Sequence, residues 1–340
     1  MWQLLNHTPF AAERTWVRDM NGAEVWIVAV KGTFVINPDG STEIAEKQED
    51  ICRVPQFLGE PGKSSLKYES DLIHTKPMTD ILLHGHAYAP RFRPVQRVDV
   101  TMKVGALTKT LRVFGDRYWN AGTIGMEMTM PEPFEKMPLI YERAFGGVDQ
   151  ISNNPKKHGW EKRNPVGTGF AMEAGNLVSQ RVPNIEDPIE LITSWKQRPR
   201  PAGFGPIARH WSPRVESAGT YDEKWEEGRL PLPPLDFSEQ YYQAAPEDQQ
   251  SPVHLRGGEM IGLNNLTPDG VLKFKLPKVV LDFRTNFGKE LVEHRANLHS
   301  LILEPDYPRV MMTWHTMLPC HHQVYKLQAT TVRQKEQIEI

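Results

Sequence analysis

Alternation of apolar and polar residues recurs along the chain and predicts β-strands, because successive side chains of a strand point to opposite faces. Residues 98–104 (VDVTMKV) and 272–276 (LKFKL) both follow this period of two. Residues 25–36 are apolar on both faces at their start, which is typical of a strand in the centre of a sheet. Further strands are expected at 80–88, 279–287, 298–303, 310–314 and 324–332.

Two turns of similar chemistry connect predicted strands. Residues 37–40 are Asn-Pro-Asp-Gly, and residues 267–270 are Thr-Pro-Asp-Gly. Proline presets the second position of a β-turn, and aspartate and glycine suit the positions that follow. Both segments therefore predict hairpin connections.

Proline divides the chain into parts of different character. The sequence contains 28 prolines, and their density in residues 151–255 leaves room for short helices only at 189–196 and 210–228. Regular β patterns occur before and after this middle region. We therefore predict a mainly β protein with a sandwich or barrel-like framework. A β-rich part (1–150) and a second β-rich part (256–340) pack together, and residues 151–255 form a loop-rich insertion or second lobe.

Composition narrows the functional classes. The 340 residues carry a formal net charge of −2, so no overall basic field favours nucleic acid. The longest apolar runs are far shorter than the roughly 20 residues that span a bilayer, and no secretory signal is visible. The two cysteines do not make a disulfide framework. We expect a soluble, cytoplasmic protein that neither inserts into a membrane nor binds nucleic acid.

A histidine pair raises the question of a metal. If residues 80–88 form one strand, His84 and His86 point to the same face, and such a pair can supply two zinc ligands when a third arrives from elsewhere. Spacing alone is a weak metal signal, and hydrogen-bonded or exposed strand histidines are the simpler interpretation. We predict no cofactor.

Catalytic chemistry finds little support in the motifs. The chain has no G-x-S-x-G nucleophile elbow. A glycosidase-like mechanism needs two carboxyl groups roughly 5–9 Å apart, a distance that the sequence does not supply. A hydrolase thus stays an alternative, for which the candidate carboxylates are Glu142, Asp149, Glu161, Asp222 and Glu223.

The segment YERAFGGVDQ (141–150) is unusually dense in functional residue types. The pair Gly146-Gly147 permits a sharp turn or a close approach of two chain segments. Arg143, beside Glu142, could hold neighbouring loops or meet a partner carboxylate. The segment is therefore either a structural junction between the middle region and the β framework or a contact surface for a partner.

Aromatic residues in the middle region also allow two interpretations. Large side chains can fill the core of a loop-rich region, and they can form a recognition surface, where tryptophan, tyrosine and arginine dominate binding energy. The residues concerned are Trp160, Phe170, Trp195, Phe204, Trp211, Tyr221, Trp225, Phe237, Tyr241 and Tyr242.

Several independent motifs of the chain resemble one family of uncharacterised domains whose genes lie beside type VI secretion spike genes. The motifs are WQLLNHTPF (2–10), YERAFGGVD (141–149), RNPVGTGF (163–170), VPNIEDP (182–188), PAGFGPI (201–207), GTYDEKW (219–225), LPLPPLDF (230–237), YYQAAPEDQ (241–249) and LRGGE (255–259).

The resemblance implies an effector adaptor or chaperone, which loads a secreted effector onto a VgrG-type spike or its PAAR-type tip. A structural module of the spike is a further alternative. No catalytic residues are established for the family, so none is carried over. The motif and partner-binding candidates are Glu142, Arg143, Phe145, Gly146, Gly147, Asp149, Asn164, Pro165, Gly167, Gly169, Tyr221, Asp222 and Trp225.

Overall fold

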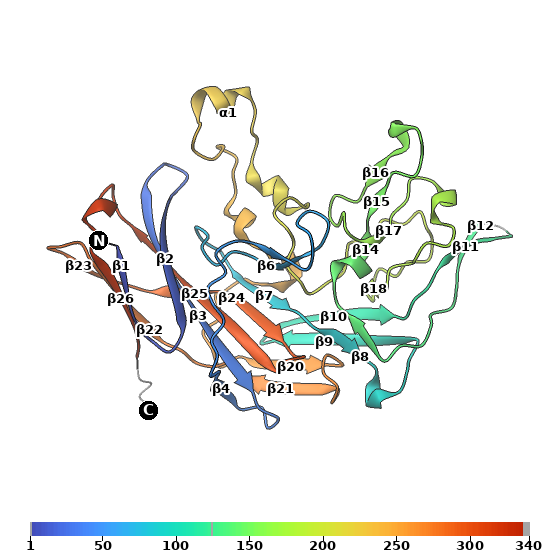
Figure 1. The fold of residues 1–340 in the computed structure, drawn as a ribbon, viewed down its shortest axis with the longest axis horizontal. Coiled ribbons are helices and arrows are strands. Elements are labelled where there is room, and N and C mark those ends of the chain that lie inside the picture. The colour runs from blue at the N-terminus through green and yellow to red at the C-terminus, as the bar shows by residue number, and fades with distance from the viewer. Residues whose placement is uncertain (1, 124, 336–340) are drawn as a thin grey trace.

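The computed structural model describes residues 2–123 and 125–335 and is built mainly from β-strands (Figure 1). Three larger sheets form a framework, and none of the sheets in the described residues closes into a barrel. The predicted mainly β framework with a loop-rich middle is confirmed.

The largest sheet has seven strands and brings the two ends of the chain together. Strand β3 lies inside this sheet and is buried over nearly its whole length, which explains its apolar residues on both faces. It pairs antiparallel with β25, from Val25 opposite Pro319 to Val35 opposite Arg309. In order, the strands are β19 (Gln250–Ser251), β7 (Thr79–Leu83), β24 (Ala296–Glu304), β25 (Arg309–Pro319), β3 (Glu24–Ile36) and β2 (Ala11–Arg18), and β4 (Thr42–Ile44) also pairs with β3.

The second sheet has five strands and confirms the clearest alternation in the sequence. In β9, Val98, Val100, Met102 and Val104 are all buried, whereas the polar positions between them are more exposed. The strands in order are β18 (Ile185–Glu186), β10 (Leu107–Phe114), β9 (Arg97–Val104), β20 (Met260–Asn264) and β21 (Val271–Lys275).

The third sheet has four strands and contains both termini of the described chain. Its strands in order are β1 (Gln3–His7), β26 (Ala329–Gln334), β22 (Leu281–Asn286) and β23 (Leu291–His294). One hydrophobic cluster runs through all three sheets and includes Trp26, Phe274 and Phe283. Strands from residues 1–150 and 256–340 thus share sheets, whereas the division into three domains stays a prediction.

Both predicted turns are confirmed. The amide of Gly40 donates to the carbonyl of Asn37 (2.9 Å) between β3 and β4. The amide of Gly270 donates to the carbonyl of Thr267 (3.0 Å) between β20 and β21. In each case the two flanking strands pair antiparallel, as a hairpin requires.

The remaining strands form five two-stranded sheets. These are β5 (Gln56–Phe57) with β6 (Leu66–Tyr68), β8 (His86–Tyr88) with β13 (Lys136–Pro138), β11 (Trp119–Gly122) with β12 (Gly125–Met128), β14 (Phe145–Gly146) with β17 (Thr168–Gly169), and β15 (Val148–Asp149) with β16 (Gly159–Trp160).

Helices are few and short. The one α-helix in the described residues is α1 (Glu223–Gly228), and no described helix has the length and apolarity needed to cross a membrane. The 3-10 turns are η1 (Pro90–Phe92), η2 (Tyr141–Arg143), η3 (Pro155–Lys157), η4 (Ala174–Leu177), η5 (Arg214–Ala218), η6 (Glu239–Tyr242), η7 (Glu247–Gln249) and η8 (Val324–Lys326).

Two parts of the middle region project from the framework (Figure 1). The first, which we call the lobe, comprises residues 144–198 and contains the small sheets of β14 to β17. The lobe has a hydrophobic cluster separate from the main core. This cluster includes Phe145, Leu177 and Val182 of the lobe, and Trp119 of β11 also belongs to it. The second, which we call the arm, comprises residues 219–237 and carries α1.

The helix predicted at 189–196 is wrong. Residues 191–193 have no regular structure, and the carboxylate of Glu186 accepts from the amide of Ile192 (2.7 Å). The side-chain oxygen of Gln197 accepts from the amides of Thr193 and Ser194. These polar side chains bind the amides that a helix would have used, so the backbone follows them instead.

Two further predictions are only partly correct. In residues 210–228, helical structure is confined to η5 and α1, because Gly219, with a φ of +83°, ends η5 and residues 219–222 separate it from α1. In residues 324–332, the segment begins as the turn η8 and only later becomes β26.

Candidate functional site

Asn164 is the centre of the junction that the YERAFGG motif forms. Its side chain is fully buried, and its amide nitrogen donates to the carbonyls of Tyr141 (2.8 Å) and Phe145 (3.0 Å). Its backbone carbonyl accepts from the amides of Gly147 (2.9 Å) and Gly167 (3.2 Å). One residue of the NPVGTG motif therefore holds the chain of the YERAFGG motif on both sides.

The glycines permit this close approach. A Cβ on Gly146 would lie 2.1 Å from the carbonyl oxygen of Asn164, and a Cβ on Gly147 would lie 2.7 Å from that of Gly167. Gly147 also has a φ of +110°, which side-chain-bearing residues rarely adopt. The parallel pairing of β14 with β17 completes the junction, to which Phe145, Gly169 and the half-buried Pro165 also belong.

The charged residues of the motif bind within the chain. The carboxylate of Glu142 accepts from the amide (2.8 Å) and hydroxyl (2.7 Å) of Ser65, which fixes the junction to the framework. Arg143 donates to the side chains of Asn184 (3.0 Å) and Asp116 (3.3 Å). This geometry is that of a structural junction.

Asp149 connects β15 to the turn η4 and to the residues just before it. Its carboxylate accepts from the amide of Met172 (2.7 Å) and from the side chain of Asn176 (2.9 Å). Burial acts to raise the pKa of Asp149, but the hydrogen bonds from Asn176 and Met172 outweigh it and lower that pKa. The side chain is a fixed anion that organises loops.

Two of the remaining carboxylates considered for hydrolysis, Glu161 and Asp222, are also engaged locally, whereas Glu223 is exposed on α1. The carboxylate of Glu161 accepts two hydrogen bonds from the guanidinium of Arg163, both of 2.8 Å, and these bonds hold the pKa of Glu161 down against the effect of burial. The carboxylate of Asp222 accepts from the amide of Trp225 (2.9 Å) and caps α1.

The two histidines do not share one strand. Strand β7 ends at Leu83, and β8 begins at His86 in a different sheet, so the predicted single strand over 80–88 is wrong. The chain changes sheets here because the amide of His84 donates to Leu303, whereas the carbonyl of Gly85 accepts from Leu139.

The histidine side chains consequently have different surroundings. The ring of His84 packs edge-on against Tyr68 with centroids 5.2 Å apart, and Nδ1 of His86 lies 2.5 Å from the carboxylate of Asp306. In the residues that the structure describes, no group of three or more histidine, cysteine or acidic side chains is placed to hold a metal.

The third group of candidates lies on the arm. Tyr221, Asp222 and Trp225 come from the start of α1, and the rings of Tyr221 and Trp225 meet edge-to-face with centroids 4.6 Å apart. Tyr221 is 57% exposed although it carries a large aromatic ring. The arm therefore presents aromatic surface to solvent, which the junction does not.

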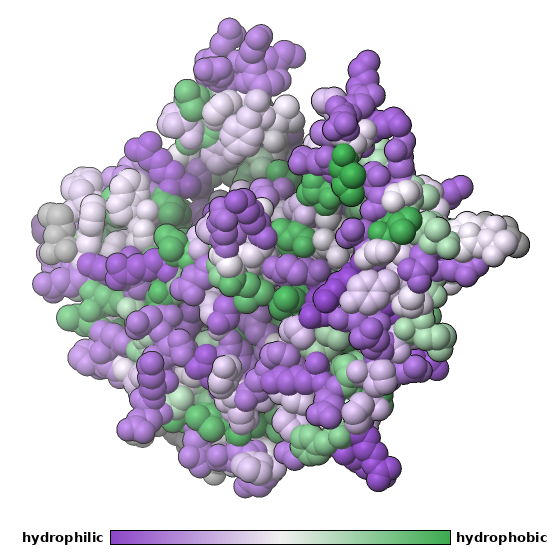
Figure 2. Space-filling model, turned by 45° about the vertical axis from the view of Figure 1, so that its right-hand side comes forward, coloured by the Kyte–Doolittle hydropathy of each residue, from purple (hydrophilic) through white to green (hydrophobic). Residues whose placement is uncertain are grey.

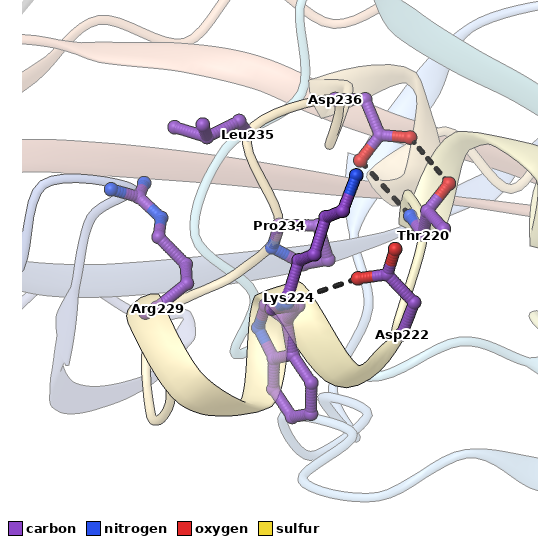
Figure 3. A pocket seen from close by; sticks show the side chains of 9 residues that line it. Thr220, Asp222, Lys224, Arg229, Pro234, Leu235 and Asp236 are labelled. Atoms are coloured by element: carbon purple, nitrogen blue, oxygen red, sulfur yellow. Dashed lines mark hydrogen bonds between the residues drawn. The ribbon is translucent and has the colours of Figure 1, made fainter.

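A hollow of about 370 Å³ opens on the arm (Figure 3). Trp225 and Pro234 line it together with Leu235, which is 82% exposed. Asp236 closes the arm by accepting from the amide (2.9 Å) and hydroxyl (2.8 Å) of Thr220. Lys224 and Arg229 also contribute to the lining.

The lobe carries an apolar patch of which the sequence analysis names only Trp160. Val148 and Trp160 lie opposite each other in the pairing of β15 with β16, and they are 49% and 55% exposed. Met172 is also exposed and lies against Gly159, beside Trp160. Two-residue strands show no alternation, so no local signal distinguished exposed Val148 from buried Asp149.

The arm and the lobe rise as separate projections with a hollow between them in the space-filling view (Figure 2). The segment before η5 contacts the lobe, where the amide of Ser212 donates to the carbonyl of Lys162 (3.0 Å). The aromatic residues of the middle region differ in burial, and their role as a recognition surface stays a prediction. Trp211 and Phe204 are buried in the main core, whereas Trp160 and Tyr221 are exposed on the projections.

Comparison with known proteins identifies a family. A family model described as uncharacterised proteins conserved in bacteria (DUF2169) matches residues 21–315, a range that includes the junction, the arm and the lobe. No curated protein and no solved structure matches the chain.

Proposed function

The chain belongs to this family of uncharacterised bacterial proteins, and from that premise we propose that it is an effector adaptor of type VI secretion. In this role it binds a secreted effector protein and presents it to VgrG- or PAAR-type spike proteins. The proposal rests on the motifs of the chain together with the surface of its two projections.

The observation that carries the proposal is the apolar surface of the arm and the lobe. Leu235 and Tyr221 on the arm, and Trp160 on the lobe, are all more than half exposed. Contiguous apolar surface and exposed aromatic residues are typical of protein-binding sites, because they become favourable contacts when a partner excludes water. Two separate projections suit a protein that must hold one partner and present it to another.

The junction supports this role indirectly. Asn164 and the glycines around it fix the lobe to the framework, so the lobe does not lose much conformational freedom when a partner binds. Preorganisation of this kind lowers the entropic cost of binding. An interface of about 1,600 Å² in total would suffice for a stable complex.

Co-expression with the effector encoded beside the nearest spike gene tests the proposal. We expect the two proteins to co-elute in size-exclusion chromatography in the absence of spike protein. If no effector from that gene cluster co-elutes, and the chain instead binds the spike alone, the proposal is contradicted and a structural module is favoured.

The hydrolase alternative predicts a different result from the same proteins. The purified chain would degrade glycan or cell-wall substrates, and Glu142→Gln would abolish that activity without preventing co-elution. We expect no turnover by either form, because the carboxylate of Glu142 is occupied by the amide and hydroxyl of Ser65.

A further inference from the structure

The arm is held in one conformation by its own hydrogen bonds. Asp222 caps the start of α1, and the indole nitrogen of Trp225 donates to the carbonyl of Leu232 (2.8 Å). Arg229 donates to the carbonyl of Pro233 (2.8 Å) and to that of Met20, which fixes the arm to the turn between β2 and β3. The arm is therefore a preformed surface.

Apolar side chains stay in solvent on this fixed surface. Leu235 borders the hollow, and Tyr221 and Leu230, which adjoin the lining residues Asp222 and Arg229 in the chain, are each 57% exposed. Trp225 forms part of the wall, where an aliphatic or aromatic side chain from a partner could pack against its ring. These exposed side chains do not stabilise the fold of the chain, because their apolar surface stays in contact with water.

The charge of the arm around the hollow favours a cationic partner. Residues 219–237 contain five carboxylates but only two cationic side chains, although the whole chain is nearly neutral. Glu223, Glu226 and Glu227 are exposed on α1, and none of them forms an ion pair within the described residues. The guanidinium of Arg229 is bound to backbone carbonyls.

We propose that the arm docks a lysine- or arginine-rich segment of the partner protein, with an apolar side chain of that segment in the hollow beside Trp225 and Leu235. This inference rests on the proposed function and specifies the partner of the same surface. The exposed carboxylates of α1 attract the cations of the segment, and the hollow fixes its position. Nucleic acids and anionic lipid surfaces carry the charge that these carboxylates repel.

Charge reversal on α1 is the matching experiment. The variant carries Glu223→Lys, Glu226→Lys and Glu227→Lys, and the control carries Glu46→Lys, Glu132→Lys and Glu135→Lys, which changes the charge equally at exposed positions outside the arm. The probe is a short amidated peptide of lysine and leucine, with a peptide of glutamate and leucine as its counterpart. Binding is measured by calorimetry at low and high salt.

We expect the lysine–leucine peptide to bind the wild-type chain and the control, and its affinity for the α1 variant to fall by about tenfold or more at low salt. The difference should shrink at high salt, and Leu235→Asn, which removes apolar surface without adding charge, should weaken binding at both salt concentrations. The glutamate–leucine peptide should not bind. Equal affinity of the lysine–leucine peptide for the α1 variant and the control, or no binding to any form, would overturn the inference.

Co-elution of the effector with the wild-type chain and with the α1 variant shows whether this inference or the proposed function has failed. If the effector co-elutes equally with the wild-type chain and the α1 variant, the arm does not dock it and the adaptor role stands. If the peptide binds the arm but no effector co-elutes with the wild-type chain, the preference of the arm for cations stands and the adaptor role fails.

Discussion

Replacing Gly146 with alanine should destabilise the protein by about 3 kcal/mol or more. The new Cβ would lie 2.1 Å from the carbonyl oxygen of Asn164 and 2.9 Å from the side chain of that residue, well inside van der Waals contact. Backbone atoms cannot swing aside as a flexible side chain does. The junction must therefore open, and the buried hydrogen bonds of Asn164 to Tyr141 and Phe145 would lengthen with it.

Urea-induced unfolding measures this effect, with Gly175→Ala as the matched control. Gly175 has no atom within 4 Å of the position of a Cβ and does not adopt a positive φ, so we expect its substitution to change the free energy of unfolding by less than about 0.5 kcal/mol. Equal stability of the two variants would show that Gly146 does not lie against Asn164.

The second large effect is a loss of stability between pH 6.5 and pH 4. Burial lowers the pKa of His84 and that of His294 to about 4, and it lowers the pKa of His315 to about 3. Burial also holds the pKa of His299 well below its usual value, and the nearby His315 and Lys76 lower it further. The rings of His299 and His315 stack with centroids 4.5 Å apart.

The direction of the effect follows from proton binding. A histidine in the unfolded chain takes up a proton near pH 6.5, whereas these histidines stay neutral in the folded chain until about pH 4 or lower. As the pH falls below 6.5, the unfolded state therefore binds more protons and is favoured. Each such histidine lowers the free energy of unfolding by about 1.4 kcal/mol per pH unit in this window.

Denaturation at several pH values between 7 and 5 measures the slope. Carboxylates with a lowered pKa, such as Glu69, contribute stability that is lost only below about pH 4.5, so they do not interfere. His315→Phe should reduce the slope by about 1.4 kcal/mol per pH unit. A free energy of unfolding that is constant from pH 7 to pH 5 would contradict the account.

Long alternating segments could be predicted from the sequence because their pattern reports burial directly. Strand β9 shows this, since its four apolar positions all lie in the core. Strand β3 was equally predictable, because only a central strand of a sheet needs apolar residues on both faces.

The structure of some segments is set by hydrogen bonds to residues outside them, and these segments could not be predicted. In residues 189–196, the carboxylate of Glu186 and the side chain of Gln197 bind amides that a helix needs. His84 and His86 were separated by a change of sheet at Gly85, which two distant pairings impose. No local pattern reveals such competitors.

Some residues of the candidate site could be predicted from the sequence, and others could not. The density of the YERAFGG motif was visible, but its meaning depended on Asn164, whose side chain binds the carbonyl of Phe145 from 19 positions away. Tyr221 and Trp225 were identified through the resemblance of their motif. Trp160 and Leu235 required the structure, because aromatic and aliphatic residues in loops serve cores and interfaces alike.

Hydrogen exchange on the chain with and without its effector tests most directly whether this protein acts by holding another protein. The amides of α1 and the neighbouring arm, residues 219–237, should exchange more slowly in the complex, and those around Trp160 should do so when spike protein is added. Unchanged exchange throughout the arm and the lobe, in a sample that contains both partners at saturating concentration, would contradict the account.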